Sequence, residues 1–211
     1  MFITFEGIEG CGKTTQAKLL TDELRRQKYG VTLTREPGGC AIADKIRAIL
    51  LDAEHAAMTP LTELLLYAAA RSQHLNDTVR PALERGEIVL CDRFTDATVV
   101  YQGYARGLDL SLIEELNLVA TNGLAPLLTI LMDCPVAIGL DRARSRINAA
   151  QGAREERFER ESLRFHEAVR NGYLALAQRE PDRFVVVDAN RQVAEIATQV
   201  AAAVTARLAG G

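Results

Sequence analysis

The chain has 211 residues, a length that favours one domain because a domain typically spans about 150 residues. Hydrophobic residues make up 48% and charged residues 25% of the chain, so the composition supports a buried core and excludes global disorder. The 25 lysines and arginines are outnumbered by 28 aspartates and glutamates, and the formal net charge is −3. Because nucleic-acid binding rests on an excess of positive charge, we expect no nucleic-acid partner.

The cysteines and histidines show no spacing typical of a metal site or a disulfide framework. No C-x-x-C motif occurs, and the three histidines lie near no second ligand in the sequence. The longest uncharged run, 116–132, is interrupted by Asn, Thr, Gly and Pro and therefore predicts no membrane span. The first residues lack the basic and small-residue features of a secretory signal, so we expect a cytoplasmic protein.

Apolar, β-rich segments alternate with segments of helical periodicity along the chain. Strands are predicted, in chain order, at 2–5, 31–34, 88–91, 127–132 and 184–187. Helices are predicted at 15–29, 61–71, 111–120, 136–147, 155–178 and 193–208. This alternation predicts an α/β fold with a five-stranded parallel sheet and helices on both faces.

Local signals mark several ends of the predicted helices. Gly30 follows the first helix, Pro60 opens the second, and Pro135 stands where a helix begins after the fourth strand. No linker or internal repeat divides the chain, so we expect residues 1–211 to form one domain. Segment 145–161 is rich in Arg, Glu, Ala and Gly, and we interpret it as exposed and mobile.

A phosphate-binding motif follows the first predicted strand directly. Residues 7–14 read G-I-E-G-C-G-K-T and match G-x-x-x-x-G-K-[ST] at every fixed position, with a predicted helix immediately after. The glycines let backbone N–H groups surround an anion, and the helix N-terminus adds partial positive charge. Lys13 can reach the β- and γ-phosphates, and the Thr14 hydroxyl can ligate Mg²⁺. The motif predicts that a nucleoside triphosphate is bound by Gly7, Ile8, Glu9, Gly10, Cys11, Gly12, Lys13, Thr14 and Thr15.

This P-loop alone leaves three classes open: a kinase, a GTPase switch and a motor-type ATPase. The N/T-K-x-D tetrapeptide that reads guanine does not occur. A motor-type ATPase places adjacent acids after a strand, whereas the third and fourth predicted strands are followed by Asp92-Arg93 and Asp133-Cys134. Arg35, at the carboxyl end of the second predicted strand, is suited to hold a second phosphate group, which favours a kinase.

Tyr67 and Arg71 lie four residues apart in a predicted helix and therefore share one face. The ring can stack on a nucleobase while the guanidinium donates to the carbonyl oxygens of the base. An aromatic core residue beside an arginine that extends to the surface shows the same spacing. The spacing leaves both interpretations open.

Three further motifs accompany the P-loop: R-E-P-G-G at 35–39, E-L-L-L-Y-A-A-A-R at 63–71, and C-D-R-F-T-D-A-T-V-V-Y-Q-G at 91–103. In order and spacing, the four motifs resemble bacterial thymidylate (dTMP) kinases, from residue 1 to about 190. The resemblance implies a P-loop nucleoside monophosphate kinase fold with a lid at about 145–161. It also implies a homodimer that transfers the γ-phosphoryl group of MgATP to dTMP, giving dTDP and ADP, in dTTP biosynthesis for DNA synthesis.

The resemblance further implies roles for individual residues. Arg35 and Arg93 bind the monophosphate, while Tyr67 and Arg71 bind thymine. Tyr101 packs against the sugar where a 2′-hydroxyl would lie. The remaining implied contacts are those of Glu9 with the 3′-hydroxyl, of Gln102 with the substrate, and of Thr14 and Asp92 with magnesium.

Phosphoryl transfer is assigned, again from the resemblance, to Lys13, Arg93 and one arginine of the lid. We select Arg146, which lies four residues after Arg142 and can face the same way. Arg154 and Arg160 can instead pair with nearby glutamates on a solvated surface. The arginines that crowd the lid region are Arg142, Arg144, Arg146, Arg154 and Arg157.

Three features depart from the family pattern. Ala97 stands where a serine is usual, with Thr98 as the neighbouring hydroxyl; Tyr67 replaces the commoner Phe; and the lid segment 147–154 is longer than expected.

Two rival functions remain: another nucleoside monophosphate kinase, and a nucleotide-binding regulatory protein without turnover. The expected dimer has apolar positions available near Leu64 and at 111–120.

Overall fold

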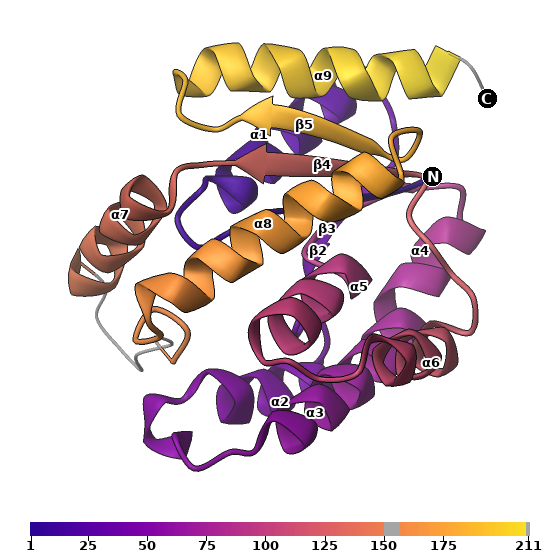
Figure 1. Cartoon of the computed structure of the whole chain (residues 1–211). Helices are drawn as coiled ribbons and strands as arrows, with labels where there is room; N and C mark the ends of the chain where they lie inside the picture. The colour runs from indigo at the N-terminus through magenta and orange to yellow at the C-terminus, as the bar shows by residue number, and fades with distance from the viewer. Residues whose placement is uncertain (150–156, 210–211) are drawn as a thin grey trace.

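The computed structural model describes residues 1–149 and 157–209 and places a parallel β-sheet at the centre of the molecule (Figure 1). Its strands are β1 (Phe2–Glu6), β2 (Val31–Arg35), β3 (Ile88–Asp92), β4 (Leu128–Asp133) and β5 (Phe184–Asp188). The spatial order is β2-β3-β1-β4-β5, and every neighbouring pair is parallel. The predicted five-stranded parallel sheet is confirmed.

Each strand ends on a charged residue. The inner strands β1, β3 and β4 are buried along nearly their whole length, as expected for continuous apolar runs in a parallel sheet. Because parallel strands all end at the same edge, their last side chains meet there. That edge therefore carries Glu6, Arg35, Asp92, Asp133 and Asp188.

The helices cover both faces of the sheet, as predicted. Figure 1 shows β4 and β5 between α9 on one side and α8 on the other. The α-helices are α1 (Lys13–Arg26), α2 (Ala41–Leu51), α3 (Pro60–His74), α4 (Arg80–Glu84), α5 (Thr95–Thr98), α6 (Leu110–Thr121), α7 (Val136–Ala149), α8 (Leu163–Arg179) and α9 (Val193–Ala209). A 3₁₀ turn (Ala53–His55) and two π-helical turns, η2 (Leu75–Val79) and η3 (Val99–Ala105), complete the described elements. None of the described helices is long and apolar enough to cross a membrane.

The side chains of strand β1 point alternately to the two faces of the sheet. Phe2 and Glu6 point to the same face because side chains alternate along a strand. Phe2 packs edge-on against Phe94 with ring centroids 4.9 Å apart, and Glu6 accepts a 2.7 Å hydrogen bond from the Tyr173 hydroxyl of α8. Phe5, on the opposite face, is fully buried. The edge of the sheet at which the strands end is thus continuous with a packed core.

Two of the three predicted helix boundary signals agree with the structure. Pro60 opens α3 directly after Thr59, whose hydroxyl caps the first turn, and α7 begins immediately after Pro135. Gly30 was expected to follow the first helix, but α1 ends at Arg26. Lys28 adopts the left-handed conformation there, with φ 73°, so the chain turns before it reaches the glycine.

The region before α8 differs from its prediction in two respects. The helix expected to begin at 155 begins at Leu163, after Ser162 caps its first turn. The segment predicted to be exposed contains Arg157 and Phe158, which are buried, and the Phe158 ring packs 5.4 Å from that of Tyr101. The ring contact explains the burial of Phe158, and a hydrogen bond from Arg157 to Glu63 explains that of the arginine. The remaining lid prediction, which includes Arg154, falls on 150–156, outside the described residues.

Candidate active site

The P-loop joins β1 to α1 and packs tightly against α7. Gly10 adopts a φ of 68°, and a Cβ atom at this position would lie 1.9 Å from the carbonyl oxygen of Gly139. Only glycine permits so close an approach of two backbones. The loop is therefore held directly at the N-terminus of α1, where backbone N–H groups are available to an anion.

Lys13 and Thr14 begin α1 and point into the site. The Lys13 ammonium donates to the carbonyl oxygens of Gly7 at 3.0 Å and Ile8 at 2.7 Å, so its charge stays against the loop. The Thr14 hydroxyl donates to a carboxylate oxygen of Asp92, at the end of β3. The structure therefore brings together the two residues predicted to hold magnesium.

Thr14 and Asp92 supply the oxygen ligands that Mg²⁺ prefers, one hydroxyl and one carboxylate. Among the described residues, no group of three or more His, Cys, Asp or Glu side chains forms a metal cage. Such a sparse site fits Mg²⁺, which commonly takes one or two protein ligands and completes its shell with phosphate oxygens and water.

A second cluster links the P-loop to the residues that follow β3. Arg93 donates to Glu9 Oε1 at 2.9 Å, and the Tyr101 hydroxyl donates to the same oxygen at 2.5 Å. The Arg93 guanidinium lies 4.8 Å from the centre of the Tyr101 ring and also donates to Tyr173 at 3.2 Å. Three predicted substrate-binding residues, Glu9, Arg93 and Tyr101, are therefore in direct contact.

Glu9 carries its negative charge within this cluster. Burial raises the pKa of the carboxyl, but the His166 side chain, Arg93 and Lys13 together hold that pKa well below its usual range. Sequence reasoning missed His166 and Tyr173. Both belong to α8, whose helical pattern gave no sign that two of its buried side chains reach the P-loop.

The pKa of Glu6, only three residues before Glu9, is shifted in the opposite direction. Burial, and to a smaller extent the nearby Asp96 carboxylate, raises the pKa of Glu6 from 4.5 to about 8. Its two oxygens accept hydrogen bonds from the backbone N–H of Phe94 and from Tyr173, each at 2.7 Å. The folded protein therefore retains a proton on Glu6 at pH values where the unfolded chain has lost it.

We expect this proton to make stability depend on pH. Since the folded state binds more protons between the unfolded pKa of 4.5 and the folded pKa of about 8, the free energy of unfolding falls as pH rises through that window. Glu6→Gln removes the titration, so the variant should lose less stability than the wild type between about pH 5 and about pH 8. Urea denaturation of both proteins measures the difference; parallel pH profiles would contradict it.

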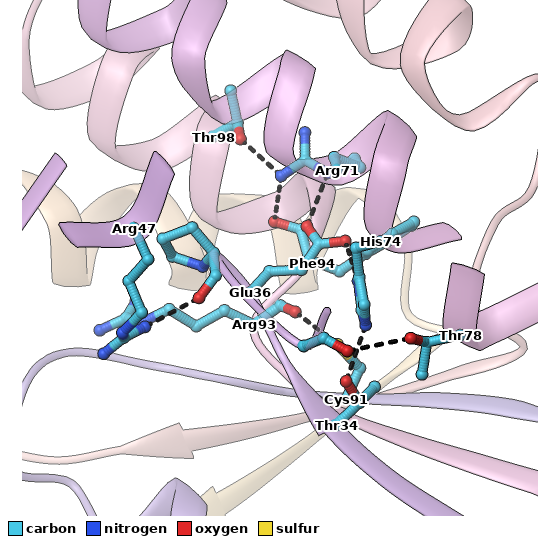
Figure 2. A network of polar contacts seen from close by, with 12 residues as sticks. Thr34, Glu36, Arg47, Arg71, His74, Thr78, Cys91, Arg93, Phe94 and Thr98 are labelled. Carbon is cyan, nitrogen blue, oxygen red and sulfur yellow. Dashed lines mark hydrogen bonds and ion pairs between the residues drawn. The ribbon is translucent and has the colours of Figure 1, made fainter. Parts of the chain in front are cut away.

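Arg71 anchors a buried polar network beneath the predicted base site (Figure 2). The side chain is only 2% exposed. It donates to Glu36 at 2.8 Å, to Asn117 at 2.6 Å and to the Thr98 hydroxyl at 2.9 Å. Arg71 thus has the partners of a core residue, while Tyr67, one turn earlier on α3, stays partly exposed.

Glu36 is the centre of this network and was missed by sequence reasoning. Figure 2 shows its carboxylate between Arg71 and His74, with His74 Nδ1 3.0 Å from the second oxygen. The other ring nitrogen of His74 lies 2.7 Å from the Thr34 hydroxyl. In the sequence, Glu36 lies beside Pro-Gly-Gly, a tripeptide typical of tight turns, and nothing in that pattern indicates a buried acid.

Arg35 and Gln102, two further predicted substrate residues, differ in exposure. Arg35 ends β2, is about half exposed, and contacts Asp44 at 3.1 Å. Gln102 is buried in η3 and donates to Glu63 at 2.7 Å. Arg35 is open to a ligand, whereas Gln102 is held by an acid of α3.

The described lid arginines contact different parts of the molecule. Arg142 donates to the carbonyl oxygen of Ala189, after β5, at 3.1 Å. Arg146 is 64% exposed and lies 3.7 Å from Glu159. Despite their four-residue spacing, the two side chains therefore have separate partners. Arg157 is buried and donates to Glu63 at 2.5 Å.

The sheet order, the P-loop and the charged cluster after β3 define a P-loop nucleoside monophosphate kinase. The family model described as "Thymidylate kinase" matches residues 5–200 of the chain. This protein therefore belongs to the thymidylate kinase family.

Individual relatives agree with the family match. The chain is 63% identical to the thymidylate kinase of Geotalea uraniireducens over 210 residues, covering 100% of this chain and 99% of the relative. It is also 63% identical to that of Geobacter sulfurreducens over 200 residues, covering 95% and 94%. The crystal structure of thymidylate kinase from Ehrlichia chaffeensis superposes with a TM-score of 0.76 at 33% identity, covering 97% of this chain and 98% of that one.

Proposed function

We propose that this protein transfers the γ-phosphoryl group of ATP to dTMP, giving dTDP and ADP, as in the biosynthesis of dTTP. The observation that carries the proposal is the contact of Glu9, inside the P-loop, with Arg93 and Tyr101. It joins the triphosphate-binding loop to the motif that the family uses for the monophosphate. Family membership over residues 5–200 supports the same reaction.

The acceptor site is proposed to lie along α3 and the carboxyl ends of β2 and β3. Arg35 and Arg93 hold the phosphate of dTMP, and Tyr67 stacks on thymine above Arg71. Arg71 retains donor capacity because a guanidinium has five N–H groups. The sugar is then contacted by Tyr101, Gln102 and, through its 3′-hydroxyl, Glu9.

The donor site is proposed to be the P-loop, residues 7–15, with Thr14 and Asp92 holding Mg²⁺. When bound, Mg²⁺ offsets charge on the β- and γ-phosphates. Lys13, Arg93 and the lid arginine Arg146 distribute the charge of the transferring group. The acceptor needs no strong general base, because the attacking oxygen of dTMP is already ionised.

A coupled assay with dTMP, dUMP, UMP and CMP tests this function. Tyr101 is held by Glu9 and packed edge-on against Phe158, and it is proposed to fill the space that a 2′-hydroxyl of the sugar would need. We expect kcat/KM for UMP to be at least about 100-fold below that for dTMP, because a misplaced hydroxyl costs both packing and orientation. Equal turnover of UMP and dTMP would contradict the assignment. Formation of dTDP in a single turnover separates the enzyme from a regulatory nucleotide-binding protein.

Three further proposals concern the whole chain: residues 1–211 form one domain with a lid at about 145–161, the protein is cytoplasmic, and it forms a homodimer. The apolar positions expected near Leu64 do not include Leu64 itself, which is fully buried in the core. The exposed apolar side chains on α3 and α6 are instead Leu61, Leu65, Leu112, Leu118 and Val119. A second copy that packs on this face would cover these exposed apolar side chains, and their exposure supports the proposed dimer.

A further inference from the structure

His166 is a buried, polar side chain that the proposed reaction does not use. It lies in α8, is fully buried, and its Nδ1 is 3.3 Å from Glu9 Oε2. Neither ring nitrogen has a hydrogen-bond partner among residues 1–149 and 157–209. A buried imidazole that makes no hydrogen bond is costly, so its ion-pair contact with the carboxylate of the P-loop residue Glu9 calls for a functional explanation.

The two oxygens of Glu9 have different surroundings. Oε1 accepts hydrogen bonds from both Tyr101 and Arg93. Oε2 is buried and has no hydrogen-bond partner in the described part of the chain, although His166 Nδ1 lies closest to it as an ion-pair contact. One N–H donated by His166 would satisfy the carboxylate oxygen and one ring nitrogen together.

The same helix also contacts the other half of the cluster. Tyr173 follows His166 by seven residues, two helical turns, so both lie on one face of α8. Tyr173 accepts a 3.2 Å hydrogen bond from Arg93, while His166 faces Glu9. One helix, α8, therefore contacts both Glu9 and Arg93, the two charged residues that are proposed to hold dTMP.

We propose that His166 is a positioning residue whose Nδ1–H donates to Glu9 Oε2 and fixes the plane of the Glu9 carboxylate toward the sugar of dTMP. The inference rests on the proposed contact of Glu9 with the 3′-hydroxyl. Both the Nδ1–H tautomer and the imidazolium carry the required donor. Without it, the carboxylate rotates about its terminal torsion, which is broad for glutamate.

Two substitutions at His166 test this role. His166→Phe keeps a ring and removes the donor, and we expect it to raise KM for dTMP about tenfold while KM for ATP changes less than about twofold. His166→Asn places an amide N–H near the position of Nδ1 and should recover KM for dTMP to within about threefold of the wild type. Thermal unfolding of each variant provides the folding control. An equal rise in KM for dTMP in His166→Phe and His166→Asn would show that His166 acts only through packing and would overturn the proposal.

A substrate that lacks the 3′-hydroxyl, 3′-deoxy-dTMP, tests whether His166 acts through the proposed contact of Glu9 with that hydroxyl. We expect the wild type to prefer dTMP about tenfold in kcat/KM, and His166→Phe to reduce that preference to about twofold or less. Glu9→Gln should reduce it in the same way, and the double variant should lose little more than either single one. If Glu9→Gln lowers the preference and His166→Phe does not, only the positioning role fails. If Glu9→Gln leaves the preference unchanged, the proposed role of Glu9 fails first.

Discussion

We expect Lys13→Ala to lower kcat by about 10²–10³-fold, because it removes the buried positive charge of the P-loop that is proposed to act on the transferring γ-phosphoryl group. Lys13 is 7% exposed and its ammonium is held by the carbonyl oxygens of Gly7 and Ile8, so its charge has a fixed place in the loop. Such preorganisation is what makes a charge effective in the transition state. Steady-state kinetics at saturating ATP and dTMP measure the loss.

Lys18→Ala is the matched control for this substitution. Lys18 lies on the same helix, α1, and is exposed. Its removal changes net charge by the same amount as Lys13→Ala but should leave kcat within about twofold, because exposed charges are screened by solvent. A Lys13→Ala enzyme that keeps kcat within about tenfold of the wild type would contradict the proposed P-loop role.

Arg71→Ala lowers the free energy of unfolding by about 3–5 kcal/mol, because it leaves the buried Glu36 carboxylate without its main cationic partner. The two side chains are 2% and 4% exposed and lie 2.8 Å apart. Arg26→Ala is the control: Arg26 is 73% exposed and its ion pair with Glu23 should contribute less than about 1 kcal/mol. Urea denaturation of both variants compares a buried with an exposed arginine.

The same Arg71→Ala variant reports on the base site if it is assayed well below its unfolding midpoint. We expect KM for dTMP to rise far more than KM for ATP, since the P-loop is formed by β1 and α1. A loss of ATP affinity with unchanged dTMP affinity would place the base site elsewhere. A stability loss below about 1 kcal/mol would show that Glu36 is satisfied without Arg71.

The strands and the P-loop could be predicted from the sequence because their signals are local. Continuous apolar runs mark the inner strands β1, β3 and β4, and the P-loop motif fixes a turn between a strand and a helix. The parallel arrangement then brings strand ends together. That is why Arg35, Asp92 and Arg93 could be expected at one edge before any coordinates were known.

The remaining site depends on contacts that no local pattern encodes. Tyr101 and Gln102 could be named only through the family motif, because they lie in η3, where the π-helical turn departs from the 3.6-residue period used to recognise helices. His166 is 157 positions from Glu9 by residue number, and its place on the buried face of α8 resembles that of any core residue. The role of Glu36 could not be predicted for the same reason, since only the folded chain places Arg71 and His74 around its carboxylate.

The close approach of Gly10 and Gly139 makes the position of the P-loop depend on two residues that have no side chain. A methyl group at position 139 would lie 2.6 Å from the carbonyl oxygen of Glu9, so the loop and α7 would have to separate. The displaced Glu9 would then carry its carboxylate away from Arg93 and Tyr101. Neither glycine can take a side chain alone without moving the P-loop relative to α7, so the first turn of α7 sets the position of the loop that is proposed to bind the phosphates of ATP.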